Sequence, residues 1–461
     1  MKKNNVDILQ GPITRGLLAM AFPIIIMNVM QTLFNVIDMT VLKMYSTDNA
    51  VGAVGASGTL ITLCTSLFVG LSAGANVAVA KRIGSGDREK VRKAATSALL
   101  AAIVGGIVLM IVGVSCAELF LKLTDCPPEI LPNAVLYFRI YFIGAPLLLI
   151  ANFCSAMLRA AGDTKKQMRI SVTGGIMKVI TTLLFVAVFK MEIAGVGIAN
   201  IMCWVVMSGW GFVCVIKHKD IPIDFKQMRF YKQELKDILF IGIPSGLQTA
   251  MYSFANVIIM TTVNSFGAAA TTGVSIANQF DGIMYQLIYA PSLAATPYIA
   301  QNIGAGNIKR VKKAIVSSVL ITSTIGLSFG LLSAIFSKQL SSIMSSTPEV
   351  IMYSSQKMML VSSTYFICGI NEIMGGVLKG MGKPIVPTVA TMLYMCGIRF
   401  VWVYVVFPLC PQNLTFLYLI WPIGWILSIL TLLAFYFPAI KKLQAEMMNH
   451  RNAPSKQTSL A

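Results

Sequence analysis

The chain has 461 residues, of which 56% are hydrophobic and only 12% are charged, about half the charged share of a typical soluble protein. Its mean hydropathy is +0.74. Long apolar runs recur over the whole length, and each could cross a hydrocarbon core of roughly 30 Å as a helix. These features exclude a set of ordinary soluble domains and predict an all-α polytopic membrane protein. The net charge of +19 does not indicate nucleic-acid binding, because the bases lie in short loops between apolar runs.

Twelve apolar segments are predicted to span the membrane. In chain order they cover residues 16–44, 50–80, 92–117, 132–158, 168–190, 194–216, 237–264, 272–302, 313–337, 349–378, 386–408 and 416–439. An even number of spans places both termini on the same side of the membrane.

The basic residues show which side that is. Most of them lie in the N-terminus, in the C-terminal tail and in the loops near 81–93, 159–169, 217–236, 303–313 and 379–385. The intervening loops hold only Lys43, Lys122, Lys190 and Lys338. Because cytoplasmic loops are enriched in Lys and Arg, we expect both termini in the cytoplasm.

The two halves of the chain repeat each other. The segment "RIGSGDREKVRKA" at 82–94 matches "NIGAGNIKRVKKA" at 302–314, and "MLRAAGDTKK" at 157–166 matches "VLKGMGKPIV" at 377–386. Pro23 and Asn35 likewise match Pro244 and Asn256. We therefore predict an N-terminal six-helix lobe (1–222), a C-terminal six-helix lobe (223–445) and a disordered tail (446–461). Six spans per half relate the lobes by a pseudo-twofold axis along the membrane normal.

The glycines of the repeated IGxG segments have an expected structural role. Long apolar helices are predicted to end at Ala80 and Ala300, and Gly84 and Gly304 could then supply left-handed caps. A phosphate-binding loop is disfavoured, because the spacing and the lysine-serine pair of such loops are missing.

Three carboxylates are predicted well inside spans: Asp38, Asp281 and Glu372. Since a charge at the bilayer centre costs at least about 2.5–3.5 kcal/mol, each is a candidate functional group. The alternative is a structural ion pair or a hydrogen bond to a neighbouring helix. Helical spacing places Gln31 and Asn35 on the same face as Asp38, a group that could hold a proton or a Na⁺ ion.

Lys178 and Arg399 are the cations predicted inside the membrane, at matching positions of the repeat. Each needs a partner there, so we expect Lys178 to pair with Asp38. The expected partner of Arg399 is Glu372 or Asp281. Extension of either side chain to the membrane surface is the alternative.

Metal and disulfide chemistry is not indicated. The nine cysteines stand singly in apolar segments without a CxxC motif. The two histidines lie in predicted cytoplasmic segments, so no transition-metal site is expected.

Several motifs together resemble the MATE (multidrug and toxic compound extrusion) transporters over essentially the whole chain. They are "GPITRGLLAMAFPIII", "LFNVIDMTVL", "VGASGTLITLCTSLFVGLSAGANVAVAKRIGSGD", "MLRAAGDTKK", "AQNIGAGN", "NEIMGGVLKGMGKPIVP" and "GIRFVWVYVVFPL". The resemblance, closest to bacterial members, implies a V-shaped pair of six-helix lobes that exchange drugs for Na⁺ or H⁺. It also implies a bacterial inner (plasma) membrane location.

The resemblance assigns roles to individual residues. Pro23 would bend the first helix fifteen residues before Asp38, and Gln31 would be a lobe position. Lys178 and Thr182 stand where the family often has an Asn and an acid, and Asn200 matches a polar partner on the sixth helix. An ammonium beside Asp38 should weaken Na⁺ binding in this lobe. Lys178 could then act as an internal counter-ion, with Na⁺, if used, nearer Asp281 or Glu372.

The expected function is therefore secondary export of amphipathic, chiefly cationic, organic compounds in exchange for H⁺ or Na⁺. The alternative is a flippase for a lipid-linked or polysaccharide precursor, which should need a more basic central cleft than Lys178 and Arg399 provide. An enzyme is disfavoured, because no constellation of catalytic residues is present, and no cofactor is expected. Small molecules and membrane lipids are the expected partners of a monomer. Further residues expected to line the lobe cavities are Asn152, Asn256, Gln279 and Tyr285.

Overall fold

The computed structural model describes residues 6–46, 48–124, 126–410 and 413–452, and within these ranges all regular structure is helical. The first half contains the long helices α1 (Ile13–Tyr45), α2 (Asp48–Ser85), α3 (Arg88–Ser115), α7 (Thr164–Thr182) and α8 (Glu192–Ile216), with the short α4 (Ala117–Lys122). A further span is formed by α5 (Leu131–Ile143) and α6 (Ala145–Ala160), which meet at an angle of 49°. A π-helical stretch, η1 (Leu183–Val188), continues α7.

The second half repeats this order. It contains α9 (Lys232–Asn264), α10 (Ala268–Gly304), α11 (Ile308–Ile335) and the short α12 (Ser337–Met344). α13 (Pro348–Ser363) and α14 (Tyr365–Gly380) follow as a second two-part element, matching α5 and α6. The chain ends with α15 (Ile385–Thr391), a stretch of short helical pieces from Met392 to Leu409 that includes π-helical turns, α18 (Leu414–Tyr418) and α19 (Ile420–Asn452).

Eight helices of the described chain are long and apolar enough to cross a membrane, or nine if α5 and α6 are one span. α9, α10 and the pair α13 and α14 lie where the other three spans were predicted. The all-helical polytopic class is thus confirmed. One boundary was wrong: α19 continues to Asn452, so residues 446–452 are helical rather than tail, and 453–461 lie outside the described residues.

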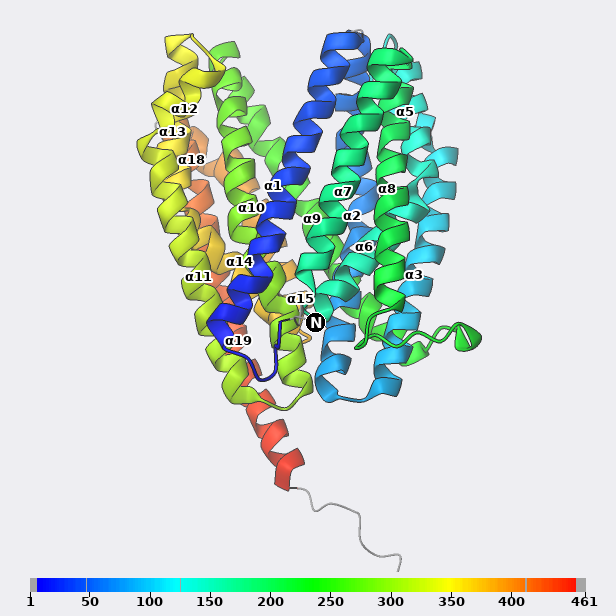
Figure 1. The fold of residues 1–461 in the computed structure, drawn as a ribbon. Helices are drawn as coiled ribbons and strands as arrows, with labels where there is room; N and C mark the ends of the chain where they lie inside the picture. Colours follow the sequence, from blue (N-terminus) through cyan, green and yellow to red (C-terminus); the bar gives the residue numbers. More distant parts are fainter. Residues whose placement is uncertain (1–5, 47, 125, 411–412, 453–461) are drawn as a thin grey trace, which may run out of the picture.

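The helices form two groups, as predicted for two lobes (Figure 1). α2, α3 and α5–α8 make one group, and α10–α14, α18 and α19 make the other. α1 belongs to both: Leu17 and Met20 pack in a core with Tyr298 of α10, whereas Val41 and Leu42 pack in the core of the first half. Pro23 lies inside this unbroken helix, and a bend there stays a prediction.

Glycine lets the two halves approach closely at one end of the molecule. A Cβ atom on Gly84 of α2 would overlap the carbonyl oxygen of Gln301 on α10, and one on Gly304 would overlap the carbonyl oxygen of Lys81. The prediction that these two glycines are left-handed caps was wrong, because Gly84 lies inside α2 and Gly304 is the last helical residue of α10. The left-handed positions are Gly86 and Gly306, with φ of 73° and 68°.

Ion pairs and hydrogen bonds join the halves at the same end. Arg82 of α2 lies 3.0 Å from Glu234 and 3.2 Å from Asp237, both on α9. Arg310 of α11 donates to the carbonyl oxygens of Ile8 (3.0 Å) and Gly11 (2.7 Å), and so holds the segment before α1. The two lobes are therefore closed together at this end.

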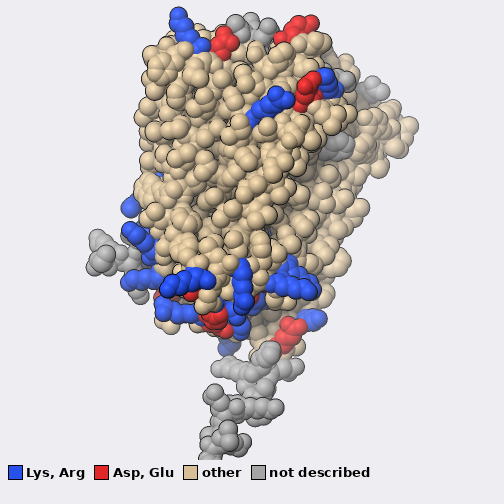
Figure 2. Space-filling view, turned by 90° about the vertical axis from the view of Figure 1, so that its right-hand side faces the viewer, with Lys and Arg blue, Asp and Glu red and all other residues tan. Residues whose placement is uncertain are grey.

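This closed end is also the basic end. On the face shown in Figure 2, most Lys and Arg side chains gather at the lower end, and a broad middle band consists almost entirely of other residues. The N-terminal segment and the end of α19 lie at the same end (Figure 1). The alternation of bases along the sequence thus corresponds to a separation of charge in space.

Gly304→Ala should destabilise the protein by about 1–3 kcal/mol, because the backbone of α2 must move away from the added methyl group. The measurement is the midpoint of thermal unfolding in detergent. Gly282→Ala is the matched control on the same helix: no atom lies within 4 Å of its Cβ position, and we expect no loss. Equal midpoints for Gly304→Ala and the wild type would show that the helices do not need this contact.

Candidate functional site

A buried ion pair lies inside the N-terminal lobe, as predicted. The Lys178 ammonium on α7 is 2.5 Å from an Asp38 carboxylate oxygen on α1, and the two side chains are 12% and 6% exposed. Lys178 also donates to Asn35 Oδ1 (2.9 Å), and Thr182 donates its hydroxyl to Asp38 Oδ1 (2.8 Å). The helical spacing of Asn35 and Asp38 on α1, and of Lys178 and Thr182 on α7, brings these four side chains together.

A second polar pair lies in the same lobe. Asn200 of α8 is buried and donates to the Val196 carbonyl oxygen (3.1 Å) and to the Tyr137 hydroxyl of α5 (3.5 Å). Asp38 and Tyr137 are close enough to interact electrostatically. The N-lobe cluster, meaning Asn35, Asp38, Lys178 and Thr182, is therefore bordered by further polar side chains.

The repeat places an equivalent cation–amide bond in the C-terminal lobe. Arg399 of α16 (Ile398–Val401) donates from Nη1 to Asn256 Oδ1 of α9 at 2.9 Å. Like Lys178 and Asn35, these partners are 143 residues apart in the sequence. Among the described residues Arg399 has no carboxylate in ion-pair reach, so its predicted pairing with Glu372 or Asp281 was wrong. Its guanidinium instead lies 5.3 Å from the ring centre of Trp421.

The partner of Asp281 is Lys357 of α13, which was not among the predicted site residues. The two charged groups are 2.8 Å apart, and their side chains are 13% and 2% exposed. Lys357 also donates to Asn278 Oδ1 of α10 and lies 5.3 Å from the Trp421 ring centre. We call Asn278, Asp281 and Lys357 the C-lobe cluster. The sequence feature that could have identified Lys357 is its position inside the predicted span 349–378.

Glu372 of α14 is the third buried acid, and its environment differs from that of the other two. Its carboxylate accepts a hydrogen bond from the Tyr252 hydroxyl (3.0 Å), and it has no ion-pair partner in the part of the chain that the structure describes. Tyr285, a predicted cavity residue, lies beside Glu372 and stacks on Tyr289 at 5.4 Å.

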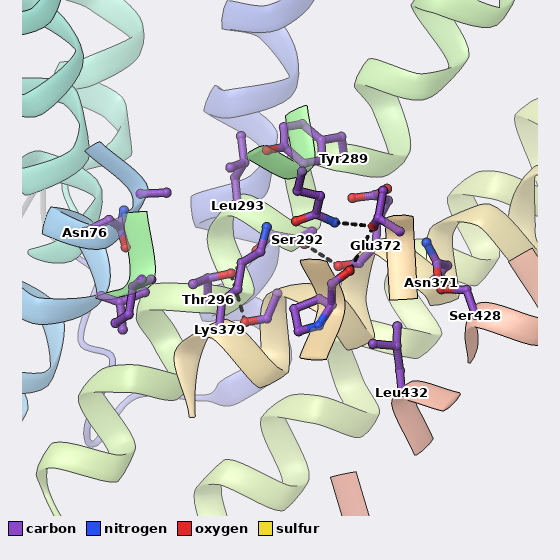
Figure 3. A pocket seen from close by; sticks show the side chains of 18 of the residues that line it. Asn76, Tyr289, Ser292, Leu293, Thr296, Asn371, Glu372, Lys379, Ser428 and Leu432 are labelled. Atoms are coloured by element: carbon purple, nitrogen blue, oxygen red, sulfur yellow. Dashed lines mark hydrogen bonds between the residues drawn. The ribbon is translucent and has the colours of Figure 1, made fainter. Parts of the chain in front are cut away.

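A cavity of about 50 Å³ lies between the two lobes and is lined by Glu372 (Figure 3). Its walls come from α2 and α6 of the first half and from α9, α10, α14, α15 and α19 of the second. Two bases line it that were predicted as cytoplasmic loop residues: Arg159 at the end of α6 and Lys379 at the end of α14. The expectation that Lys178 and Arg399 alone supply basic groups to the interior was therefore wrong.

Three predicted cavity residues form no hydrogen bond with these groups in the described structure. Gln31 of α1 and Gln279 of α10 are exposed side chains. Asn152 of α6 donates to the Leu148 carbonyl oxygen one turn earlier (2.9 Å). Within the described ranges no group of three or more His, Cys, Asp or Glu side chains could hold a metal ion.

Comparison with known proteins identifies the family. The MatE family model matches twice, at residues 23–184 and 244–405, one match in each half. The chain therefore belongs to the MATE family; it is a membrane transporter and not an enzyme. The paired matches also confirm the internal repeat.

Individual relatives cover most of the chain. A probable multidrug resistance protein of Bacillus subtilis is 27% identical over 403 residues, 86% of this chain and 88% of that protein. A FAD transporter of Shewanella oneidensis is 26% identical over 391 residues, 83% of this chain and 85% of that protein. The fold matches a solved outward-facing MATE multidrug transporter with a TM-score of 0.88 at 19% identity, over 96% of this chain and 99% of that one.

Replacing Lys357 by Met should destabilise the protein by about 3–5 kcal/mol, because it leaves the Asp281 carboxylate buried and unpaired. Thermal unfolding in detergent measures the change. Adding Asp281→Asn should recover most of the loss. The control is Lys122→Met, which breaks an exposed pair with Glu118 and should change stability by less than about 1 kcal/mol. If both lysine variants unfolded alike, Lys357 and Asp281 would not form a buried pair.

Proposed function

We propose that this transporter is a secondary active antiporter that exports amphipathic organic compounds in exchange for H⁺ or Na⁺. The observation that carries the proposal is the buried Asp38–Lys178 pair. A carboxylate and an ammonium inside a membrane protein are costly to maintain and are characteristic of ion pathways. The names of several relatives, which are multidrug resistance proteins, support export of varied compounds.

In the proposed cycle Lys178 is the internal counter-ion of Asp38. Protonation of the carboxylate would remove its attraction for the ammonium, which could then turn toward Asn35 alone. The ammonium at 2.5 Å occupies the position in which a Na⁺ ion would approach the carboxylate. Proton coupling is therefore favoured in this lobe.

The C-terminal lobe offers two further ion-coupling acids. Asp281 is paired with Lys357 and so resembles Asp38 in its chemistry. Glu372 instead accepts from a neutral tyrosine hydroxyl. A carboxylate without an ammonium partner is better suited to carry an exchangeable proton, or to bind Na⁺, than one that has such a partner. Arg399, bound to Asn256 and beside Trp421, would keep this lobe polar and positively charged.

Alternating access would move the two lobes relative to each other. If the basic end is cytoplasmic, as the positive-inside rule requires, both termini lie in the cytoplasm and the observed closure is on that side of a bacterial plasma membrane. Access from the cytoplasm would then require the contacts of Arg82 with Glu234 and Asp237 to break. A bend of α1 at Pro23 could accompany this change, and a single protomer holds all these parts.

A flippase for a lipid-linked or polysaccharide precursor is the second candidate, and one observation favours it. Arg159 and Lys379 give the space between the lobes more positive charge than the sequence suggested. Their presence weakens the expectation that substrates are chiefly cationic. The relative named as a FAD transporter indicates that phosphate-bearing molecules can be carried on this fold.

Transport by purified protein in proteoliposomes tests the antiport, with Na⁺ and pH gradients imposed separately and a panel of organic dyes. We expect uptake or efflux of at least one dye under the pH gradient. Asp38→Asn and Lys178→Ala should each reduce it at least tenfold, and the double variant should recover part of the activity, because it leaves no unpaired charge. Full activity in both single variants would exclude the counter-ion role. Absence of transport of any dye under either gradient would favour the flippase.

Alternating access predicts that charge reversal at Arg82 opens the basic end. Spin labels attached at Lys90→Cys on α3 and Lys313→Cys on α11 would report the distance between the lobes there, in a background without native cysteines. Arg82→Glu should shift the population toward longer distances, because it turns two attractions into repulsions. Combining it with Glu234→Arg should reverse the shift. An unchanged distance distribution in Arg82→Glu would show that these pairs do not hold the lobes closed.

A further inference from the structure

We infer that the cavity between the lobes binds an anionic group, such as a carboxylate or a phosphate, on an amphipathic substrate, and that Arg159 and Lys379 hold this group. The inference rests on the proposed transport function and narrows its substrate class. It is carried by the position, burial and charge of residues around one cavity.

Arg159 and Lys379 are equivalent residues of the two repeats. Each is the next-to-last residue of its helix, α6 or α14. A turn with a left-handed glycine follows in each case, at Gly162 (φ 76°) and Gly382 (φ 75°). Since both side chains line the same cavity, the pseudo-twofold relation brings one base from each lobe to a shared space near the axis.

The charges around the cavity do not balance. Its charged lining residues are Arg159, Lys379 and Glu372, so the ionised lining carries one net positive charge. Glu372 and Lys379 lie two turns apart on α14, about 10 Å along the helix axis, and neither base forms an ion pair among the described residues. Arg159 Nε is buried without a hydrogen-bond partner there. Both side chains are half-buried. A cation partly withdrawn from water without a partner is unfavourable, and an anionic ligand would supply one.

Two amide side chains that line the cavity indicate which further chemical groups the ligand has. Asn76 donates its amide to the Ala156 carbonyl oxygen, and Gln248 donates to the Thr391 hydroxyl, which leaves the oxygen of each amide buried without a partner in the described structure. In Figure 3, Asn76 is seen on the left and Glu372 and Asn371 on the right, with Lys379 between them. These oxygens are acceptors, so they fit hydroxyl or amine donors close to the anionic group.

The size of the cavity limits what it can enclose. About 50 Å³ holds a few atoms, because a single water needs roughly 10–15 Å³ of such space. The cavity therefore fits a headgroup, while the apolar part of the molecule must lie outside it.

The placement of the bases links binding to the conformation. One base comes from each lobe, so an anion held by both stabilises the state in which the lobes are together at the basic end. When the lobes separate there, the bases separate and the affinity must fall. A ligand can shift a conformational equilibrium only through such a difference in affinity.

Binding of the fluorescent carboxylate 11-(dansylamino)undecanoic acid to the purified full-length protein tests the inference, with its uncharged methyl ester as the comparison ligand. We expect the acid to bind at least tenfold more tightly than the ester. Arg159→Gln and Lys379→Gln should each weaken binding of the acid about tenfold, or 1.4 kcal/mol, and leave the ester unaffected. The conservative variants Arg159→Lys and Lys379→Arg should keep most of the affinity, which separates loss of charge from loss of folding.

The matched controls are Lys165→Gln and Lys383→Gln, exposed bases just beyond the same two helices, and they should bind the acid as the wild type does. Equal losses in the controls and in the cavity variants, or wild-type affinity in Arg159→Gln/Lys379→Gln, would overturn the inference. Repeating the titration in vesicles with and without phosphatidylglycerol distinguishes the source of the anion. Competition by this lipid that is lost in the cavity variants would identify a lipid headgroup, and its absence a free organic anion.

The anion site and the proposed antiport can be overturned separately. Transport of cationic dyes together with unchanged acid binding in the cavity variants would overturn this inference alone. Specific acid binding without transport under either gradient would instead overturn the antiport and leave the anion site standing.

Discussion

The structure depends on one constraint, which is that a charge inside a membrane protein must find its partner within the protein. Water is scarce there, and an unpaired carboxylate or ammonium costs several kcal/mol. Asp38 with Lys178 and Asp281 with Lys357 meet this constraint by direct ion pairs at 2.5 Å and 2.8 Å. Because each pair joins two helices, the ionisation state of one carboxylate affects how those helices pack.

The repeat preserves some of these contacts and changes others. The bond from Lys178 to Asn35 recurs as the bond from Arg399 to Asn256, with the same spacing. The acids do not recur: the position matching Asp38 is apolar, and the C-terminal lobe takes its carboxylate from α10 instead. The conserved part of the geometry is thus the amide–cation bond between the first and fifth spans of each lobe. The variable part is the acid, which is the group that an ion gradient would act on.

Much of the fold and one of the buried ion pairs could be predicted from the sequence. Hydropathy located the spans, because a helix must be apolar over some 20 residues to cross a bilayer. The Asp38–Lys178 pair could also be predicted, since each residue is an isolated charge in an apolar run and a charge there needs a partner. The partner of Arg399 could not. The partner of a buried charge depends on which helices are neighbours. In the structure Asp281 is paired with Lys357 of α13, and Arg399 is bonded to Asn256.

Two other predictions were wrong for the same physical reason: the role of the two glycines and the location of two bases. Gly84 and Gly304 were interpreted from their own segments, where a glycine after an apolar run is typical of a helix end. Arg159 and Lys379 were counted with the loops for the same reason. In each case the deciding neighbour belongs to the other lobe: a carbonyl oxygen against the glycines, and the shared cavity for the bases. Contacts between segments some 220 residues apart cannot be recognised from the local pattern of a single sequence.

Several contacts that the sequence did not reveal lie between the lobes, and a transport cycle would act on these. Within a lobe, helices packed against one another can keep their arrangement while the lobes move. Between the lobes, the glycine crossing, the Arg82 ion pairs and the paired bases of the cavity must all change together when the basic end opens. An anion bound between Arg159 and Lys379 would oppose that opening, whereas protonation of a carboxylate inside a lobe would weaken the ion pair that joins two of its helices. Substrate and coupling ion would thus both affect the opening of the lobes at the basic end, each through its own residues. Antiport requires such a coupling between the two binding sites.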